Sequence, residues 1–236
     1  MDWERKVRGV CDLVILVDAS AGMEADFQDV RETIRKTVSN IFAGGVCGLR
    51  ETRVCIWGYR NAAADGVDWL DCRPFVEDVE GFEQQLASLR FHGGGETGSL
   101  IDALLKLCEQ VEESDTCSLT DSNAARGCDP YKWRKRRSAD RMIWVFSNRS
   151  GEVSGGLNVG CPIEVDDVIN LLMLHHMRLC LFTPSLPFYE VLEDVDRTEH
   201  FLLPLKNCYK SFNSQILERC LESLARGCLH GCGESL

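Results

Sequence analysis

The chain has 236 residues and carries 26 basic against 37 acidic side chains, which gives a formal net charge of −11 at pH 7. This acidic balance argues against general binding to nucleic acid or to an anionic membrane surface, because both are negatively charged. The hydrophobic fraction of 44% is ordinary for a globular protein, and the length suits one large α/β domain. Since no apolar run approaches roughly 18 residues and Met1–Lys6 is charged, we expect no membrane span, no signal peptide and a cytoplasmic location.

The thirteen cysteines admit two interpretations. A secreted domain uses cysteines in disulfides, whereas a cytosolic one keeps them reduced. The number is odd, and Cys11, Cys55, Cys108 and Cys180 lie within apolar runs, where cysteine behaves as a small core residue. We therefore expect reduced thiols, and a secreted or surface adhesion domain with disulfides is the alternative.

Apolar runs alternate with helical periodicities along the chain. Short apolar runs bounded by turn residues predict strands, at residues 11–17, 53–59, 142–146, 178–182 and 201–203. The polar-edged segment 68–76 contains Pro74, which suits an edge strand because proline cannot donate to a central ladder. Apolar residues three or four apart predict helices, over residues 24–42, 82–89, 99–111, 165–176, 188–194 and 212–224.

This alternation predicts an α/β fold with a doubly wound, mostly parallel sheet of about six strands and helices on both faces. We expect one domain over residues 1–227, with an insertion loop over about 113–140 and a Cys/Gly-rich tail at 228–236. In such sheets ligands bind beyond the carboxyl ends of the strands, where strand order reverses. Asp18 and Ser147 both follow predicted strands at that edge.

Several segments resemble the von Willebrand factor A (VWA) family. Asp12–Met23 resembles the first strand and metal loop, whose family pattern is Asp-x-Ser-x-Ser or, in one branch, Asp-x-Thr-Gly-Ser-Met. Ile56–Asn61 is similar to a Tyr-Arg-Asp segment, and Phe75–Phe82, Gly93–Thr97 and then Asp102-Ala103-Leu104 follow in the family's order. The resemblance is strongest from 11 to 105 and points to the Rossmann-like VWA branch found alongside alpha-kinases.

The resemblance implies a site for a hard cation such as Mg²⁺ or Mn²⁺, which prefers oxygen ligands. Carried over residue by residue, the family's ligand positions are matched by Asp18, Ser20 and Thr97. A one-residue shift would give the position of the threonine to Glu96 or Ser99 instead.

Two positions depart from the family's ligand set. Gly22 stands where the second serine should bring a hydroxyl, and Asn148 stands near the family's later aspartate. The neighbouring Arg149 would repel a cation. We therefore expect a degenerate metal-ion-dependent adhesion site (MIDAS), in which a divalent cation is optional.

The leading hypothesis is a non-enzymatic intracellular interaction module that binds a protein partner through the loops at the carboxyl ends of the strands. The residues expected to contact this partner are Ser20, Ala21, Gly22, Met23, Glu96, Thr97, Asn148 and Arg149. We expect no catalytic residues, since the chain has no Gly-x-Ser-x-Gly elbow, phosphate loop or dinucleotide fingerprint. An enzyme with an unusual metal site, or with a reactive cysteine near His92, His175 or His230, is the competing class.

Three further features have both a structural and a functional interpretation. Cys220, Cys228, His230 and Cys232 carry zinc-type ligands but lack a Cys-x2-Cys pair, which favours a reduced tail over a zinc site. His175-His176 is interpreted as a core or helix-end pair. The basic run Lys132–Arg137, with Trp133 inside it, suits an acidic partner, RNA or an import receptor, but an exposed loop neutralised by nearby acidic groups is favoured.

Overall fold

The computed structural model describes residues 9–46, 48–111, 129–136, 138–151, 164–204, 209, 210, 212 and 215–221. The strands are β1 (Val10–Asp18), β2 (Glu51–Tyr59), β3 (Leu70–Asp71), β4 (Asp140–Phe146), β5 (Met177–Pro184) and β6 (Glu199–Leu203). The α-helices are α1 (Glu24–Phe42), α2 (Ala62–Asp65), α3 (Val79–Ser88), α4 (Leu100–Glu109), α5 (Val165–Leu174) and α6 (Pro187–Leu192). Two 3-10 helices, η1 (Ala21–Met23) and η2 (Gly66–Trp69), and a helical segment at 215–221 complete the described elements.

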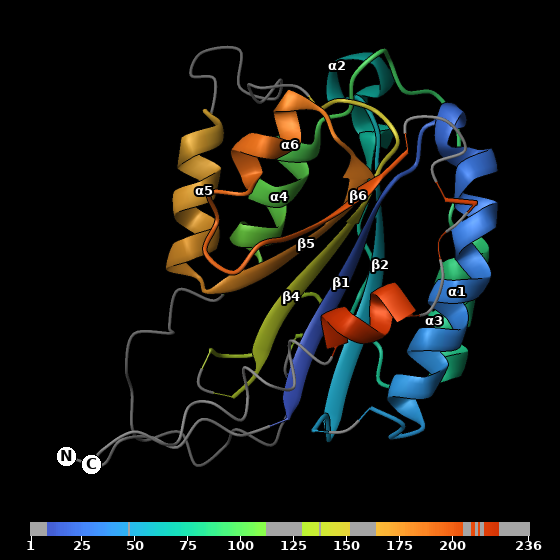
Figure 1. The fold of residues 1–236 in the computed structure, drawn as a ribbon, viewed down its shortest axis with the longest axis vertical. Helices are drawn as coiled ribbons and strands as arrows, with labels where there is room; N and C mark the ends of the chain where they lie inside the picture. Colours follow the sequence, from blue (N-terminus) through green and yellow to red (C-terminus); the bar gives the residue numbers. More distant parts are fainter. Residues whose placement is uncertain are drawn as a thin grey trace.

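The six strands form one sheet in the order β3-β2-β1-β4-β5-β6 (Figure 1). All neighbouring pairs are parallel except β2 and β3, which are antiparallel. Strand order therefore reverses between β1 and β4, which lie side by side from Cys11↔Asp140 to Val17↔Phe146. The predicted doubly wound, mostly parallel sheet of about six strands is confirmed.

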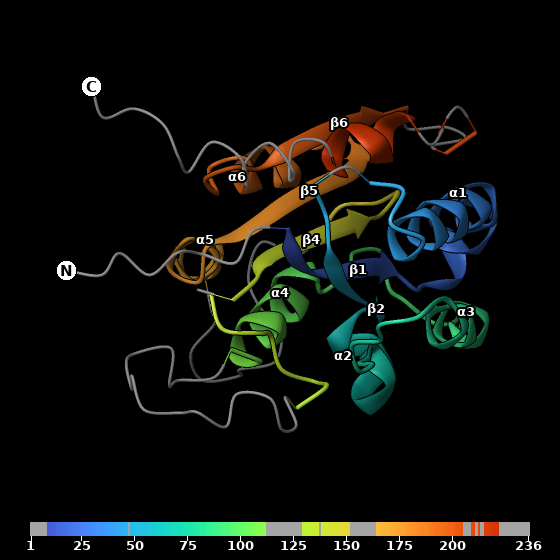
Figure 2. The ribbon, with the colours of Figure 1, turned by 90° about the horizontal axis from the view of Figure 1, so that it is seen from below.

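Helices cover both faces of the sheet, so β1 is buried on both sides (Figures 1 and 2). Leu13, Ile15 and Val17 belong to the same core cluster as residues of α1, α3 and segment 215–221. The alternate residues Val14 and Leu16 belong to the cluster formed with α4, α5 and α6. Side chains alternate across a strand, so a continuous apolar run is the pattern expected of a strand between two helical layers.

The predicted edge strand over 68–76 is largely wrong. Only Leu70–Asp71 pairs with β2, and Val76 forms an isolated bridge to Val54. Between these two points Pro74 has no N–H to give to a ladder, and the Trp57 indole donates to the Arg73 carbonyl at 2.8 Å. The segment therefore runs beside β2 without forming a continuous strand.

The end of the predicted insertion packs against the amino-terminal end of the sheet. Trp133 is buried, and its indole donates to the Leu107 carbonyl at 2.8 Å. Arg134 donates to the carboxylate of Asp12 through its backbone N–H and its Nε, both at 2.7 Å. The interpretation of the basic run as exposed is therefore wrong for Trp133, which is a core residue, whereas Arg134 is neutralised by a nearby acid. Arg137 lies outside the described residues.

A second arginine completes this buried network. Arg53 donates to both oxygens of Asp12, from Nε at 2.9 Å and from Nη2 at 2.7 Å. Asp12 is fully buried, and the side chains of Arg53 and Arg134 are 5% and 12% exposed. The carboxylate thus joins β1, β2 and residues 132–134 at the end of the sheet opposite the candidate site.

Candidate functional site

The candidate site forms where strand order reverses, at the carboxyl ends of β1 and β4. Asp18 is the last residue of β1 and is fully buried, and Ser147 directly follows β4. The Ser147 hydroxyl donates to Asp18 Oδ2 at 3.2 Å. The expectation that these two residues share one edge is confirmed.

Arg149 contacts the same carboxylate. Its Nε donates to Asp18 Oδ2 at 2.5 Å and its Nη2 donates to Oδ1 at 3.0 Å, which is a bidentate contact. The side chain of Arg149 is 16% exposed, so the pair is largely shielded from water. Burial opposes the charge of the guanidinium, but Asp18, Tyr59 and Tyr189 outweigh it and raise the pKa of Arg149.

The first loop turns sharply around Asp18. The Ser20 N–H donates to Asp18 Oδ1 at 3.0 Å, so this carboxylate fixes the turn that leads into η1. The Ser20 hydroxyl is buried and has no hydrogen-bond partner among the described residues. Ala21 and Gly22 are exposed. The prediction that Met23 offers a contact surface is wrong, because Met23 is fully buried in the core with α1.

The side chain of Asn148 is directed to the start of α1. Its Nδ2 donates to Asp26 Oδ2 at 2.6 Å and to the Gly22 carbonyl at 3.2 Å. Asn148 therefore ties the loop after β4 to the loop after β1. Asn148 therefore has a structural role, which its position near the family's later aspartate ligand does not suggest.

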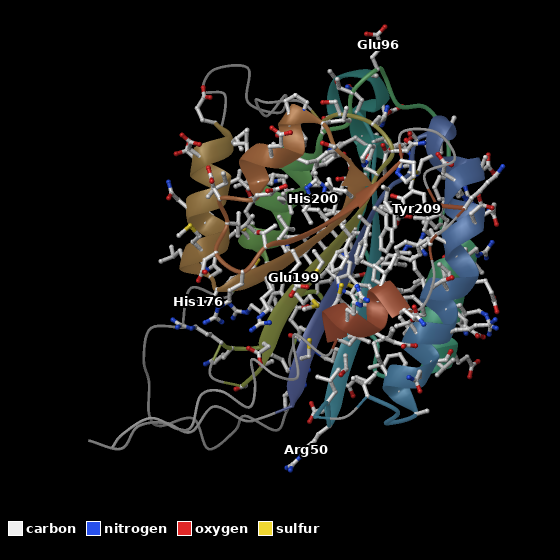
Figure 3. The ribbon with its side chains drawn as sticks, viewed as in Figure 1. Arg50, Glu96, His176, Glu199, His200 and Tyr209 are labelled. Carbon is white, nitrogen blue, oxygen red and sulfur yellow. The ribbon has the colours of Figure 1, made fainter. Side chains whose placement is uncertain are left out.

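The glycine loop between α3 and α4 borders the site next to the loops that follow β1 and β4. Glu96 is exposed and points away from the body of the molecule (Figure 3). Thr97 is half-buried, and its carbonyl accepts from Asn61 Nδ2 at 3.1 Å. The alternative ligand Ser99 uses its hydroxyl to accept the Ala62 N–H at 2.9 Å. None of these contacts brings a side-chain oxygen to Asp18.

Arg60 holds the loops of this edge together, which the sequence did not indicate. Its guanidinium donates to the backbone carbonyls of Ala19 at 3.1 Å, Asp68 at 2.6 Å and Arg90 at 2.5 Å. The Asp65 carboxylate adds a second fastening by accepting the Gly94 N–H at 2.9 Å. The Tyr-Arg segment of the resemblance is therefore a scaffold for the site.

Two tyrosines from the carboxy-terminal part of the chain fix the loop after β4. The Tyr209 hydroxyl donates to the carbonyls of Phe182, at 2.7 Å, and Ser147, at 3.2 Å. The Tyr189 hydroxyl donates to the Arg149 carbonyl at 2.5 Å. These contacts hold the backbone of Ser147 and Arg149, so the direction of the arginine is set by residues far along the chain.

The residues present do not fit a hard divalent cation. Such an ion takes about six oxygen ligands, whereas both Asp18 oxygens already accept from Arg149. Gly22 brings no side-chain oxygen, and the Asn148 amide is bonded to Asp26. The Ser20 hydroxyl, which has no hydrogen-bond partner among the described residues, could supply only one ligand oxygen. No group of three or more His, Cys, Asp or Glu in the described ranges is placed to hold a metal.

Cys55 and Cys108 are not suited to act as thiolate nucleophiles. None of Cys11, Cys55, Cys72, Cys108, Cys180 and Cys220 is in a disulfide. Burial raises the pKa of Cys108 to about 12 and raises the pKa of Cys55 well above its usual value. A reactive cysteine needs the opposite shift. As expected, Cys11, Cys55, Cys108 and Cys180 are core residues.

One hydroxyl–imidazole–carboxylate series does occur, and the sequence did not indicate it. Thr183 Oγ1 lies 2.9 Å from His200 Nε2, and His200 Nδ1 lies 2.6 Å from Glu193 Oε1. Thr183 is fully buried and the His200 side chain is 5% exposed. His200 is labelled in Figure 3. Because a substrate could not reach this hydroxyl, the series acts as a tie between β5, β6 and the end of α6.

The remaining candidates lie away from this edge. His175 and His176 directly follow α5, and His176 has φ 52 in the turn to β5, so the helix-end interpretation is confirmed. Of the zinc candidates only Cys220 is described, and Cys228, His230, Cys232 and the tail 228–236 lie outside the described residues. No helix within the described ranges is long and apolar enough to cross a membrane.

The sheet order and the loops at its switch point define a Rossmann-like α/β domain with a site at the carboxyl edge. Within it, residues 12–117 match the model of the von Willebrand factor type A domain, which supports a VWA domain in this chain. The match spans β1 to α4, and β4, β5 and β6 complete the same sheet outside it. No curated protein matches the chain significantly.

Proposed function

We propose that this chain is a non-enzymatic intracellular module that binds a protein partner through the upper edge, which we define as residues 20–22, 93–99 and 147–151. A VWA domain generally serves as a protein-interaction module, and the match over residues 12–117 supports that general role. The partner, the edge and the intracellular setting are our proposal.

The main support for this proposal is that the three loops of the upper edge are bonded to one another. Gly98 pairs with Gly151, the Ala21 N–H donates to the Gly93 carbonyl at 3.3 Å, and Asn148 is bonded to Gly22. A surface fixed before binding loses little conformational freedom on association. The exposed parts of this surface include Ala21, Gly22 and Glu96.

Two charge reversals at opposite ends of the sheet test the proposal. Glu96 lies at the upper edge and Arg50 lies at the far end, before β2, and both side chains are exposed (Figure 3). Chemical crosslinking and affinity purification of Glu96→Arg, or of Ala21→Arg, should lose partners that the wild type and Arg50→Glu retain. Identical partner sets for all four proteins would reject the upper edge as the binding surface.

Two finer assignments belong to the same proposal. The segments Asp18–Met23 and Tyr59–Asn61 support placement in the branch found alongside alpha-kinases, with a degenerate MIDAS. The buried, disulfide-free Cys11, Cys55 and Cys108 support a reducing compartment. Mass spectrometry of the native protein tests the compartment, because disulfides elsewhere in the chain would favour the secreted alternative.

A further inference from the structure

The Asp18 carboxylate has no acceptor position left for a metal ion. Oδ1 accepts from the Ser20 N–H and Arg149 Nη2, and Oδ2 accepts from the Ser147 hydroxyl and Arg149 Nε. A carboxylate offers about four lone-pair sites; the three N–H groups take three of them, and the Ser147 hydroxyl, 3.2 Å from Oδ2, occupies the fourth. A cation could bind Asp18 only after Arg149 had moved away.

We propose that Arg149 is the resident cation of this site and that the site is therefore independent of divalent metal. The guanidinium is permanently charged and matches the two carboxylate oxygens with its fork. It supplies positive charge at the carboxylate that a VWA domain otherwise presents to a metal. A second cation brought to the same point would be repelled by it.

The glycine loop leaves the space that the guanidinium fills. A Cβ at Gly94 would lie 3.1 Å from Arg149 Nη2 and 2.4 Å from the Ser20 Cβ, and one at Gly98 would lie 3.5 Å from Nη2. The Arg149 Nη1 also donates to the Gly95 carbonyl at 2.5 Å. These glycines therefore cradle the arginine as well as turning the chain.

The arginine is fixed at both ends. Its carbonyl accepts from Tyr189, and its guanidinium is bonded to Asp18 and Gly95. The departures at Gly22 and Asn148 agree with this arrangement. Gly22 adds no oxygen, and Asn148 donates to Asp26 instead of facing Asp18. Loss of ligands and gain of an internal cation thus occur together at one edge.

The first arm of the test is a Mn²⁺ titration of the wild-type protein followed by NMR. Paramagnetic broadening reports a bound ion at known amides without any partner, so this test stands apart from the proposed function. We expect no saturable broadening at residues 18–22 and 147–149, and the same midpoint of thermal unfolding with millimolar Mg²⁺ and with EDTA. Saturable broadening there, abolished by Asp18→Asn, would overturn the proposal.

The second arm removes the arginine. Gly22→Ser restores the missing hydroxyl, and a Cβ at Gly22 meets no atom within 4 Å. In the double variant Gly22→Ser/Arg149→Met we expect Mn²⁺ to raise the unfolding midpoint and to bind at least roughly tenfold more tightly than to wild type. Arg149→Lys keeps the positive charge but loses the bidentate guanidinium. It should fold and should not gain Mn²⁺ binding, which would show that the positive charge excludes the ion. An Arg149→Met protein as stable as wild type in EDTA would also refute the role of Arg149.

Discussion

Replacing Asp12 by asparagine should strongly destabilise the fold. The substitution removes the buried carboxylate that pairs with both Arg53 and Arg134, whose side chains are only 5% and 12% exposed. The four hydrogen bonds to Asp12, two from Arg53 and two from Arg134, lose their charged acceptor. Breaking a buried ion pair by removing one partner costs about 3–5 kcal/mol. That is a large part of the ~5–15 kcal/mol that stabilises a typical domain.

The assay is urea unfolding followed by tryptophan fluorescence, to which Trp133, next to Arg134, contributes. Glu51→Gln is the matched control, since Glu51 also contacts Arg134 but is 62% exposed. An exposed pair contributes about 0–1 kcal/mol. Limited proteolysis should in addition cut the Asp12→Asn protein near residues 132–136 earlier than the control. Equal unfolding free energies for the two variants would show that the hydrogen bonds to Asp12 do not hold residues 132–136 against the sheet.

Three further predictions concern the site and the buried thiols. Gly94→Ala should destabilise the fold by more than Gly44→Ala in thermal unfolding. Both glycines have positive φ, which costs another residue about 1–2 kcal/mol, but only Gly94 is also crowded; equal losses would contradict the cradle. Ser20→Ala should not lower stability, because the hydroxyl it removes is buried and has no hydrogen-bond partner within the described part of the chain, so a marked loss would reveal a bound group. Stability should fall as pH rises from about 9 to about 12, since the unfolded chain loses the Cys108 proton while the folded chain, with the pKa of Cys108 raised to about 12, retains it. Urea unfolding of Cys108→Ala should show a shallower fall, and an unchanged slope would contradict this.

The fold was predictable because its signals are local. The helix expected over 24–42 is α1 as observed, and the apolar run at 11–17 is the doubly covered strand β1. The run at 11–17 is apolar on both faces of the strand, whereas the helix over 24–42 is apolar along one stripe only. Both patterns can be recognised in the sequence without tertiary information. The region 62–76 was harder, because α2, η2 and β3 are each two to four residues long and are held by side-chain bonds to distant carbonyls.

The candidate site was predictable in place but not in chemistry. The position of Asp18 and Ser147 follows from strand order, whereas their hydrogen bond to each other depends on β1 and β4 being neighbours. From the sequence Arg149 looked like a group that repels a cation beside the site. In the structure its side chain enters the site and takes both Asp18 oxygens.

By itself the sequence determined the alternation of strands and helices outside residues 62–76, the doubly wound class and the edge where polar residues gather. Each of these depends on periodicity and on residues adjacent in the chain. Only the tertiary structure decided that Arg53 and Arg134 neutralise Asp12 and that Arg149 neutralises Asp18. Arg134 and Arg149 lie 122 and 131 positions away in the chain from their carboxylates, and a buried carboxylate must be paired by whatever charge the fold brings to it.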